Sequence, residues 1–102
     1  MAVKPNARKE AAEAERIARE NFLIMVGGNV KLFRERRYWT QDKLAEQAHI
    51  SCKYIHDIER GKKCISIWVL RKIARAMDVE IGHILSDNAD IPEHLFAYAD
   101  IR

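Results

Sequence analysis

The sequence predicts an all-α fold in a single small domain. Apolar residues recur at helical spacing, serine or threonine precedes several of these segments, and 102 residues at 48% hydrophobic composition supply one core. We expect a five-helix domain over residues 26–85, an added amphipathic helix within residues 1–25, and a short acidic C-terminal appendage over residues 86–102.

The first helix of the domain is expected to begin near Val26 and to turn Val30 and Phe33 inward. The preceding segment, Lys9 to Met25, has apolar residues at helical spacing and predicts an amphipathic helix before the domain. Two glycines at 27–28 weaken the helical pattern between these segments by about 1 kcal/mol each.

The run from Thr40 to Gly61, TQDKLAEQAHISCKYIHDIERG, predicts two short helices joined by a tight corner. Thr40 and Ser51 are suited to cap the two helices, because their hydroxyls accept a hydrogen bond from an otherwise unpaired backbone N–H. His49 stands at the corner, where the chain needs positive φ, and histidine is enriched among the non-glycine residues that tolerate it. Gly61 follows the second helix as its stop.

Each of these two helices has one apolar face. The residues expected to face inward are Leu44, Ala45, Ala48, Ile55 and Ile58. The residues left to face out from the second helix are Cys52, Lys53, His56, Asp57 and Arg60. An apolar face opposite a polar, donor-rich face is the layout of a helix-turn-helix DNA reader, whose second helix enters the major groove.

Two further helices complete the expected domain. Ser66 precedes a fourth helix with an inward stripe of Val69, Leu70, Ile73 and Met77. A fifth helix follows, with apolar residues Ile81, Ile84 and Leu85. The tail contains Pro92 at a plausible first helical position and three clustered apolar side chains, Leu95, Phe96 and Tyr98.

Val30, Phe33 and Arg34 are followed by the segments TQDKLAEQA, ISCKYIHDIERGK and SIWVLRKIARAMDVEIGHIL. On these residues the chain resembles the Cro and phage-repressor (xenobiotic-response-element type) helix-turn-helix family, over well more than half of its length. The combination is specific, although each piece alone would be weak. The chain departs from the family pattern at two positions: His49 replaces the usual corner glycine, and Ile65 stands where proline often precedes the fourth helix.

The resemblance implies a DNA-binding surface centred on the second helix of the run. Base edges would be read by Cys52, Lys53, His56 and Asp57. Phosphates would be contacted by Gln41, Lys43, Tyr54, Arg60, Lys62 and Lys63. The resemblance also implies a buried ion pair between Arg34 and Glu59, since a lone carboxylate on the inner side of the helix would be costly. The alternative for Glu59 is a surface acid.

Several of these roles have alternatives at the level of sequence. The three lysines at 53, 62 and 63 could simply be solvated, as most exposed lysines are. Asp57 could accept from cytosine N4 or could repel phosphate and so tune specificity. Cys52 could pack on a thymine methyl group or, with a lowered pKa, act as a redox-sensitive thiol.

Charge is distributed unevenly along the chain. Residues 26–85 carry twelve Lys and Arg against seven Asp and Glu, whereas residues 86–102 carry one against four. This favours a phosphate backbone as partner of the domain, although a pI near 9.0 is common among small proteins. Two cysteines, no secretory signal pattern and no apolar stretch of membrane-spanning length favour a reducing cytoplasm, and the resemblance implies a bacterial or phage-encoded protein.

We expect neither catalysis nor a cofactor. His49, Cys52 and His56 do not complete a tetrahedral metal site, and nothing marks a positioned base beside a cysteine nucleophile. The expected function is therefore that of a sequence-specific DNA-binding transcriptional regulator, a repressor that reads the major groove with the helix over residues 52–60. The alternatives are the DNA-binding antitoxin of a toxin–antitoxin pair and a protein-interaction adaptor on the same fold.

The partner is expected to be double-stranded DNA with a pseudo-palindromic operator, bound by a homodimer, because one helix-turn-helix buries little surface on DNA. The terminal segments carry more apolar side chain than a small monomer needs outside its core. They either fold back to enlarge the core or, with the fifth helix around Ile81 and Ile84, build a two-fold interface. They could also hold a protein partner.

Overall fold

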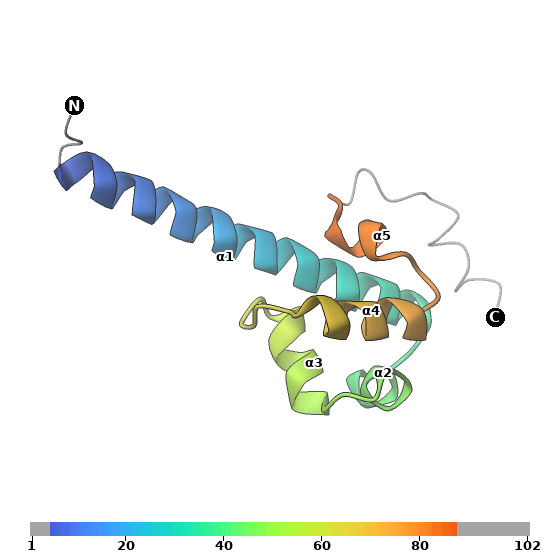
Figure 1. The fold of residues 1–102 in the computed structure, drawn as a ribbon. Helices are drawn as coiled ribbons and strands as arrows, with labels where there is room; N and C mark the ends of the chain where they lie inside the picture. The colour runs from blue at the N-terminus through green and yellow to red at the C-terminus, as the bar shows by residue number, and fades with distance from the viewer. Residues whose placement is uncertain (1–4, 88–102) are drawn as a thin grey trace.

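The computed structural model describes residues 5–87, and the C-terminal appendage beyond residue 87 lies outside this range. The described chain forms five helices and no strand, which confirms the all-α fold. In chain order the helices are α1 (Pro5–Arg36), α2 (Gln41–Ala48), α3 (Cys52–Glu59), α4 (Ile67–Ala76) and α5 (Ile81–Leu85) (Figure 1).

The N-terminal segment and the first helix of the domain are one continuous helix. Where the sequence suggested an added helix followed by a new one from Val26, α1 runs unbroken from Pro5 to Arg36. The reason lies at Gly27, which is buried against the backbone carbonyls of Ile58 and Glu59. The close approach of α1 and α3 thus uses a residue without a side chain, and this packing offsets the poor helix propensity of glycine.

The core lies around the C-terminal half of α1. The helices α3 and α5 pack against this half, and α2 and α4 pack on them and on each other, while the N-terminal half projects away from the domain (Figure 1). The buried apolar residues of the core are Val26, Val30, Phe33, Leu44, Ala45, Ala48, Ile55, Ile58, Leu70, Ile73, Ala74, Met77 and Ile84. Residues 7–22 of α1 are exposed throughout, so this segment does not fold back to enlarge the core.

The helix caps lie where the sequence predicts them. The hydroxyls of Thr40, Ser51 and Ser66 accept hydrogen bonds from backbone N–H groups three residues later, at 3.0, 3.0 and 3.1 Å. His49 adopts φ 57° and ψ 46° at the corner, and Gly61 adopts φ 72° after α3. The corner between α2 and α3 and the residue that ends α3 therefore have the left-handed backbone conformation that the sequence predicts.

A buried polar residue joins α1 to the end of α5. The side-chain amide nitrogen of Asn29 donates to the backbone carbonyls of Ile84, at 2.8 Å, and Ser86, at 2.6 Å. The last carbonyls of a helix lack partners within it, so the amide of Asn29 supplies a donor at the end of α5. Asn29 is 1% exposed and was not anticipated from the sequence.

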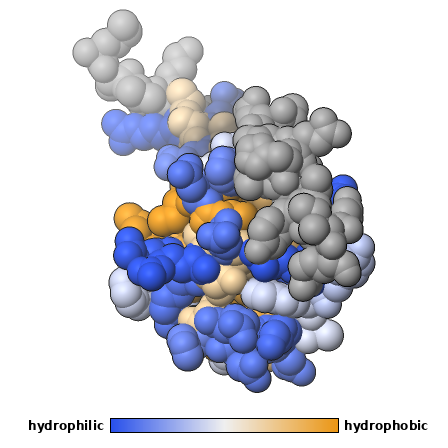
Figure 2. All heavy atoms as spheres, turned by 90° about the vertical axis from the view of Figure 1, so that its right-hand side faces the viewer, coloured by the Kyte–Doolittle hydropathy of each residue, from blue (hydrophilic) through white to orange (hydrophobic). Residues whose placement is uncertain are grey.

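The face of the domain shown in Figure 2 is mostly polar where described residues are visible. From the right-hand side of Figure 1, hydrophilic residues cover much of the visible domain and hydrophobic ones form a smaller band (Figure 2). Among residues 5–87, no helix combines the length and the hydrophobicity that crossing a bilayer requires.

Candidate nucleic-acid interface

A bidentate ion pair fixes α3 to α1. Nε and Nη2 of Arg34 donate to the two carboxylate oxygens of Glu59, at 2.7 and 2.9 Å. The side chains are only 9% and 3% exposed. The hydrogen bonds to Glu59 raise the pKa of Arg34 above its ordinary value despite the burial that opposes this. The resemblance implied this pair, and the structure contains it.

Two more hydrogen bonds extend the pair into a network. Nη1 of Arg34 donates to the carbonyl of Trp39, at 2.7 Å, and Nε2 of Gln41 donates to Oε1 of Glu59, at 3.0 Å. The connection between α1 and α2, the start of α2 and the end of α3 are thereby tied together. The Gln41 side chain, which the sequence analysis assigned to a phosphate, is engaged with Glu59 in the free protein.

The outer face of α3 presents a surface ion pair. Nζ of Lys53 lies 3.2 Å from Oδ2 of Asp57, one helical turn later. The Lys53 side chain is 84% exposed, whereas that of Asp57 is 19% exposed. A base edge approaching this face would meet the exposed ammonium group first and the more buried carboxylate second.

The end of α3 and the following loop add exposed donors. His56 and Arg60 lie side by side on the surface, with Nη1 of Arg60 at 3.4 Å from Nε2 of His56. Lys62 and Lys63 follow and are both exposed. The ammonium group of Lys63 lies 5.9 Å from the centroid of the Tyr54 ring, and Tyr54 itself is half-buried against the core.

A small hollow lies between side chains of α3, of its N-cap and of the loop that follows it. Its volume is about 170 Å³, and it is lined by Ser51, Lys53, Tyr54, Asp57 and Lys63. The structure thus brings two expected base readers together with two expected phosphate contacts. Lys43 is not among them: it lies on α2, where its ammonium group pairs with Glu46 at 3.6 Å.

Cys52 differs from its expected placement. The sequence predicts that its side chain faces out, but it is half-buried and packs against the core at the start of α3. A hydrogen bond to the Asp42 carboxylate, together with loss of solvation, raises the pKa of the Cys52 thiol above its ordinary value. A redox gate requires a lowered pKa, so this environment opposes that alternative.

His49, Cys52 and His56, weighed above as metal ligands and set aside, belong to no metal-binding group within the described chain. In residues 5–87, no three side chains among His, Cys, Asp and Glu lie close enough together to hold a metal ion.

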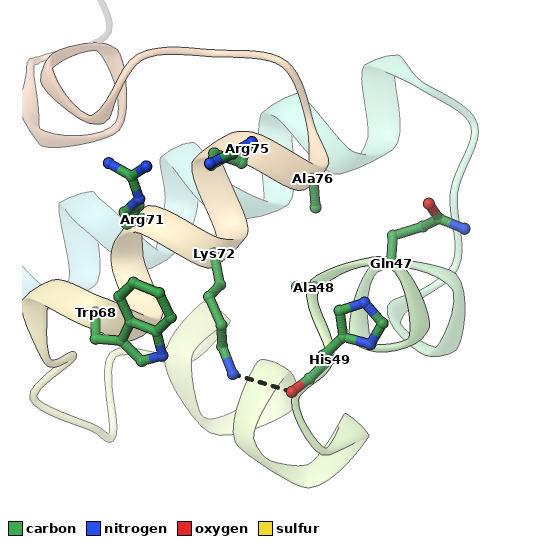
Figure 3. Close-up of a pocket in the computed structure, with 8 residues that line it drawn as sticks. All are labelled: Gln47, Ala48, His49, Trp68, Arg71, Lys72, Arg75 and Ala76. Atoms are coloured by element: carbon green, nitrogen blue, oxygen red, sulfur yellow. Dashed lines mark hydrogen bonds between the residues drawn. The ribbon is translucent and has the colours of Figure 1, made fainter.

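A second surface hollow was not anticipated. It lies between the end of α2 and α4, has a volume of about 430 Å³ and is lined by two alanines together with Gln47, His49, Trp68, Arg71, Lys72 and Arg75 (Figure 3). Trp68 is 64% exposed, although tryptophan is seldom so open to solvent. A tryptophan in the outward register of a helix is the sequence signal that could have found it.

Known proteins are similar to this chain in sequence and in fold. A family model described as Helix-turn-helix matches residues 30–84, more than half of the chain. The chain is 34% identical over 75 residues to the immunity repressor protein of Bacillus phage phi105, covering 74% of this chain and 52% of that protein. It is 33% identical over 67 residues to the competence pilus inhibition repressor of Acinetobacter baylyi, covering 64% and 61%.

A solved structure also matches the fold of this chain. The restriction-modification controller protein C.AhdI from Aeromonas hydrophila superposes with a TM-score of 0.60 at 26% identity, covering 61% of this chain and 94% of that one. The chain spans only about half to three fifths of the length of the two repressors it matches. On the family match and on the geometry of α2 and α3, the chain belongs to the Cro and phage-repressor helix-turn-helix family.

Proposed function

We propose that this protein is a sequence-specific DNA-binding transcriptional regulator, acting as a repressor and without catalysis. The two relatives described above by sequence are repressors by name, which favours this role over an antitoxin or an adaptor. Such a regulator would act in the cytoplasm of a bacterium, and its gene would belong to the host or to a phage.

The observation that carries the proposal is the fixed position of α3. Its inner face is held by Ile55 and Ile58 in the core and by the bond of Glu59 to Arg34, while its outer face consists of polar and charged side chains. A helix that is rigid relative to its domain and polar on its free side is what insertion into the major groove requires.

The residues of this surface would fall into two groups, those that contact base edges and those that contact phosphates. Lys53 and His56 are exposed on the outer face of α3 and would meet base edges, together with Asp57 and the partly covered Cys52. The phosphate contacts would come from α2, from α3 and from the loop after α3, with Gln41 and Lys43 exchanging their present partners for phosphate; the six residues are Gln41, Lys43, Tyr54, Arg60, Lys62 and Lys63. On DNA, Lys53 would exchange Asp57 for a base acceptor, and the freed carboxylate would then favour a base that donates, such as cytosine.

The proposed DNA-bound form is a homodimer on a pseudo-palindromic operator. The free half of α1 exposes Ile17 and Phe22, at 46% and 47%, and Ile24 is 57% exposed further along the helix. These side chains give a second copy an apolar surface. Ile84 does not contribute to it, contrary to the expectation for the fifth helix, because it is 0% exposed within the core. A two-fold dimer would set two copies of α3 about 34 Å apart, one turn of DNA.

Titration with genomic DNA fragments at several salt concentrations tests DNA binding itself. A regulator or an antitoxin binds, and its affinity falls steeply as salt rises, because bound Lys and Arg release counterions from the phosphates. An adaptor would give no salt-dependent shift, and that result would contradict the proposal. If a neighbouring gene encodes a toxic product, the protein is the antitoxin of a toxin–antitoxin pair and not a stand-alone regulator.

A further inference from the structure

The hollow between α2 and α4 has the composition of a site for an acidic, aromatic chain segment. Its lining brings together three cationic side chains, Arg71, Lys72 and Arg75, and contains no carboxylate. The indole of Trp68 forms one wall, as Figure 3 shows. Cations that flank an exposed aromatic face fit a partner that carries both carboxylates and rings.

The three cations are available to such a partner to different degrees. Arg71 and Arg75 are exposed, and neither takes part in the ion pairs found among residues 5–87. Lys72 is half-buried, and its ammonium group donates to the carbonyl of His49 at 3.0 Å. That bond leaves two of its three hydrogens for other acceptors. The site therefore has one half-buried cation held by a backbone carbonyl and two exposed cations outside the ion pairs of the described residues.

The helix α4 has a second large apolar side chain that is open to solvent. Ile67, next to Trp68, is 82% exposed. Two adjacent large apolar residues open to solvent on a small domain mark a contact surface when polar groups surround them. The surface therefore favours an occupant with apolar side chains as well as negative charge.

The chain contains a segment of that chemistry. Residues 88–102 carry three acidic residues, Asp90, Glu93 and Asp100, against one arginine. Between these acids lie the apolar residues Ile91, Leu95, Phe96 and Tyr98. The segment therefore supplies both carboxylates for the three cations of the hollow and rings for its indole.

The segment also begins close enough to reach. It follows α5, which packs against α4, the helix that forms one side of the hollow. Fifteen residues span up to about 50 Å when extended, whereas the two shorter dimensions of the protein are 29 and 19 Å. Chain length therefore permits docking within one molecule, and equally docking on a second copy.

We propose that residues 88–102 dock in the hollow between α2 and α4, with their rings against Trp68 and their carboxylates on Arg71, Lys72 and Arg75. The docked segment neutralises positive charge beside His49, the corner that precedes α3. In consequence it lowers the affinity of the protein for polyanions, which is the only part of this inference that rests on the proposed function.

A nitroxide label in the tail tests the docking in the full-length chain. The label is attached at Ala97→Cys after Cys52→Ser and Cys64→Ser, and the broadening of amide and indole N–H signals is measured by NMR. We expect the indole signal of Trp68 to lose most of its intensity relative to the reduced label, while the free half of α1 keeps its signals. An unaffected Trp68 would overturn the proposal.

Matched variants separate docking from random collisions. The change Arg71→Gln with Arg75→Gln should restore most of the Trp68 signal, as should high salt, whereas the control Arg8→Gln with Arg19→Gln on the free half of α1 removes equal charge and should not. Equal broadening in all variants would overturn the proposal. Mixing labelled chains with isotopically enriched, unlabelled chains identifies a second copy as the acceptor if Trp68 broadens in the mixture.

The consequence for DNA is measured separately. Neutralising the tail by Asp90→Asn, Glu93→Gln and Asp100→Asn should tighten the binding of duplex DNA several-fold at low salt. If the label reports docking but the parent binds no DNA at all, the proposed function fails and the docking stands. If DNA binds but Trp68 is unaffected, the docking fails and the proposed function stands.

Discussion

Gly27 of α1 lies directly against the backbone carbonyl of Ile58 in α3, so close that a β-carbon on Gly27 would overlap that oxygen. The obstacle is backbone at the end of a helix, which cannot move aside as a flexible side chain could. Gly28, the next residue, has open space around its own β-position. The two adjacent glycines of α1 therefore have opposite structural roles.

Substitution of each glycine by alanine should accordingly have opposite effects. Gly27→Ala should lower the free energy of unfolding by about 1–3 kcal/mol or more, as overpacking does, because α1 must move away from α3. Gly28→Ala should raise it by about 0.5–1 kcal/mol through helix propensity. Urea denaturation followed by circular dichroism measures both. Equal effects of the two substitutions would show that α1 does not approach α3 in this way.

Substitution of only one partner of the Arg34–Glu59 ion pair should destabilise the fold more than its share of the double substitution. Arg34→Met or Glu59→Leu alone should cost about 3–5 kcal/mol, because each leaves a buried charge without its partner. The double substitution should cost less than the sum of the two. A double-mutant cycle in urea provides the measurement, with the exposed pair of Lys43 and Glu46 as control, where about 0–1 kcal/mol is expected. Additive losses at Arg34 and Glu59 would contradict the coupling.

Cys52 should react slowly with iodoacetamide. Its pKa is raised by the Asp42 carboxylate, so the protonated form persists until the pH passes well above that of an ordinary thiol, and only the thiolate reacts. A raised pKa also means that this group stabilises the fold below its unfolded pKa and loses that contribution as the pH rises through the folded one.

Mass spectrometry after brief labelling at pH 8 measures this reactivity, with the exposed Cys64 as internal reference. We expect Cys64 to be modified first and Asp42→Asn to accelerate the labelling of Cys52. Faster labelling of Cys52 than of Cys64 in the parent would show that the thiol has a lowered pKa instead.

The exposed apolar residues of α1 should decide assembly. If they form the two-fold interface, Ile17→Gln with Phe22→Gln should convert a dimer into a monomer at micromolar concentration in light scattering. Glu10→Gln with Glu15→Gln, on the same free half of the helix, is the matched control and should leave the dimer intact. A parent that stays monomeric even when bound to DNA would exclude this dimer.

The sequence predicted those parts of the fold that local rules control. The caps at Thr40, Ser51 and Ser66 and the positive φ of His49 depend on a few neighbouring residues, so spacing and residue type were sufficient. The inward residues of α2 and α3 followed from helical periodicity in the same way.

The features that the sequence did not reveal depend on contacts between distant segments. Gly27 weakens a helix by local propensity, and only the position of α3 shows why it is there. Asn29 resembles any surface amide until α5 is placed against it. The inward rotation of Cys52 and the hollow beside Trp68 likewise arise from how α2, α3 and α4 pack together.

The central claim is that α3 reads bases while its flanks hold phosphates, and selection of bound duplexes from a random pool tests it most directly. The parent should enrich one pseudo-palindromic motif. Lys53→Ala should change the preferred bases and lose about 1–3 kcal/mol on the parental site. Lys62→Ala should keep the motif but bind all sequences more weakly, with a salt slope lower by about one. No enriched motif, or parental behaviour from both variants, would contradict the claim.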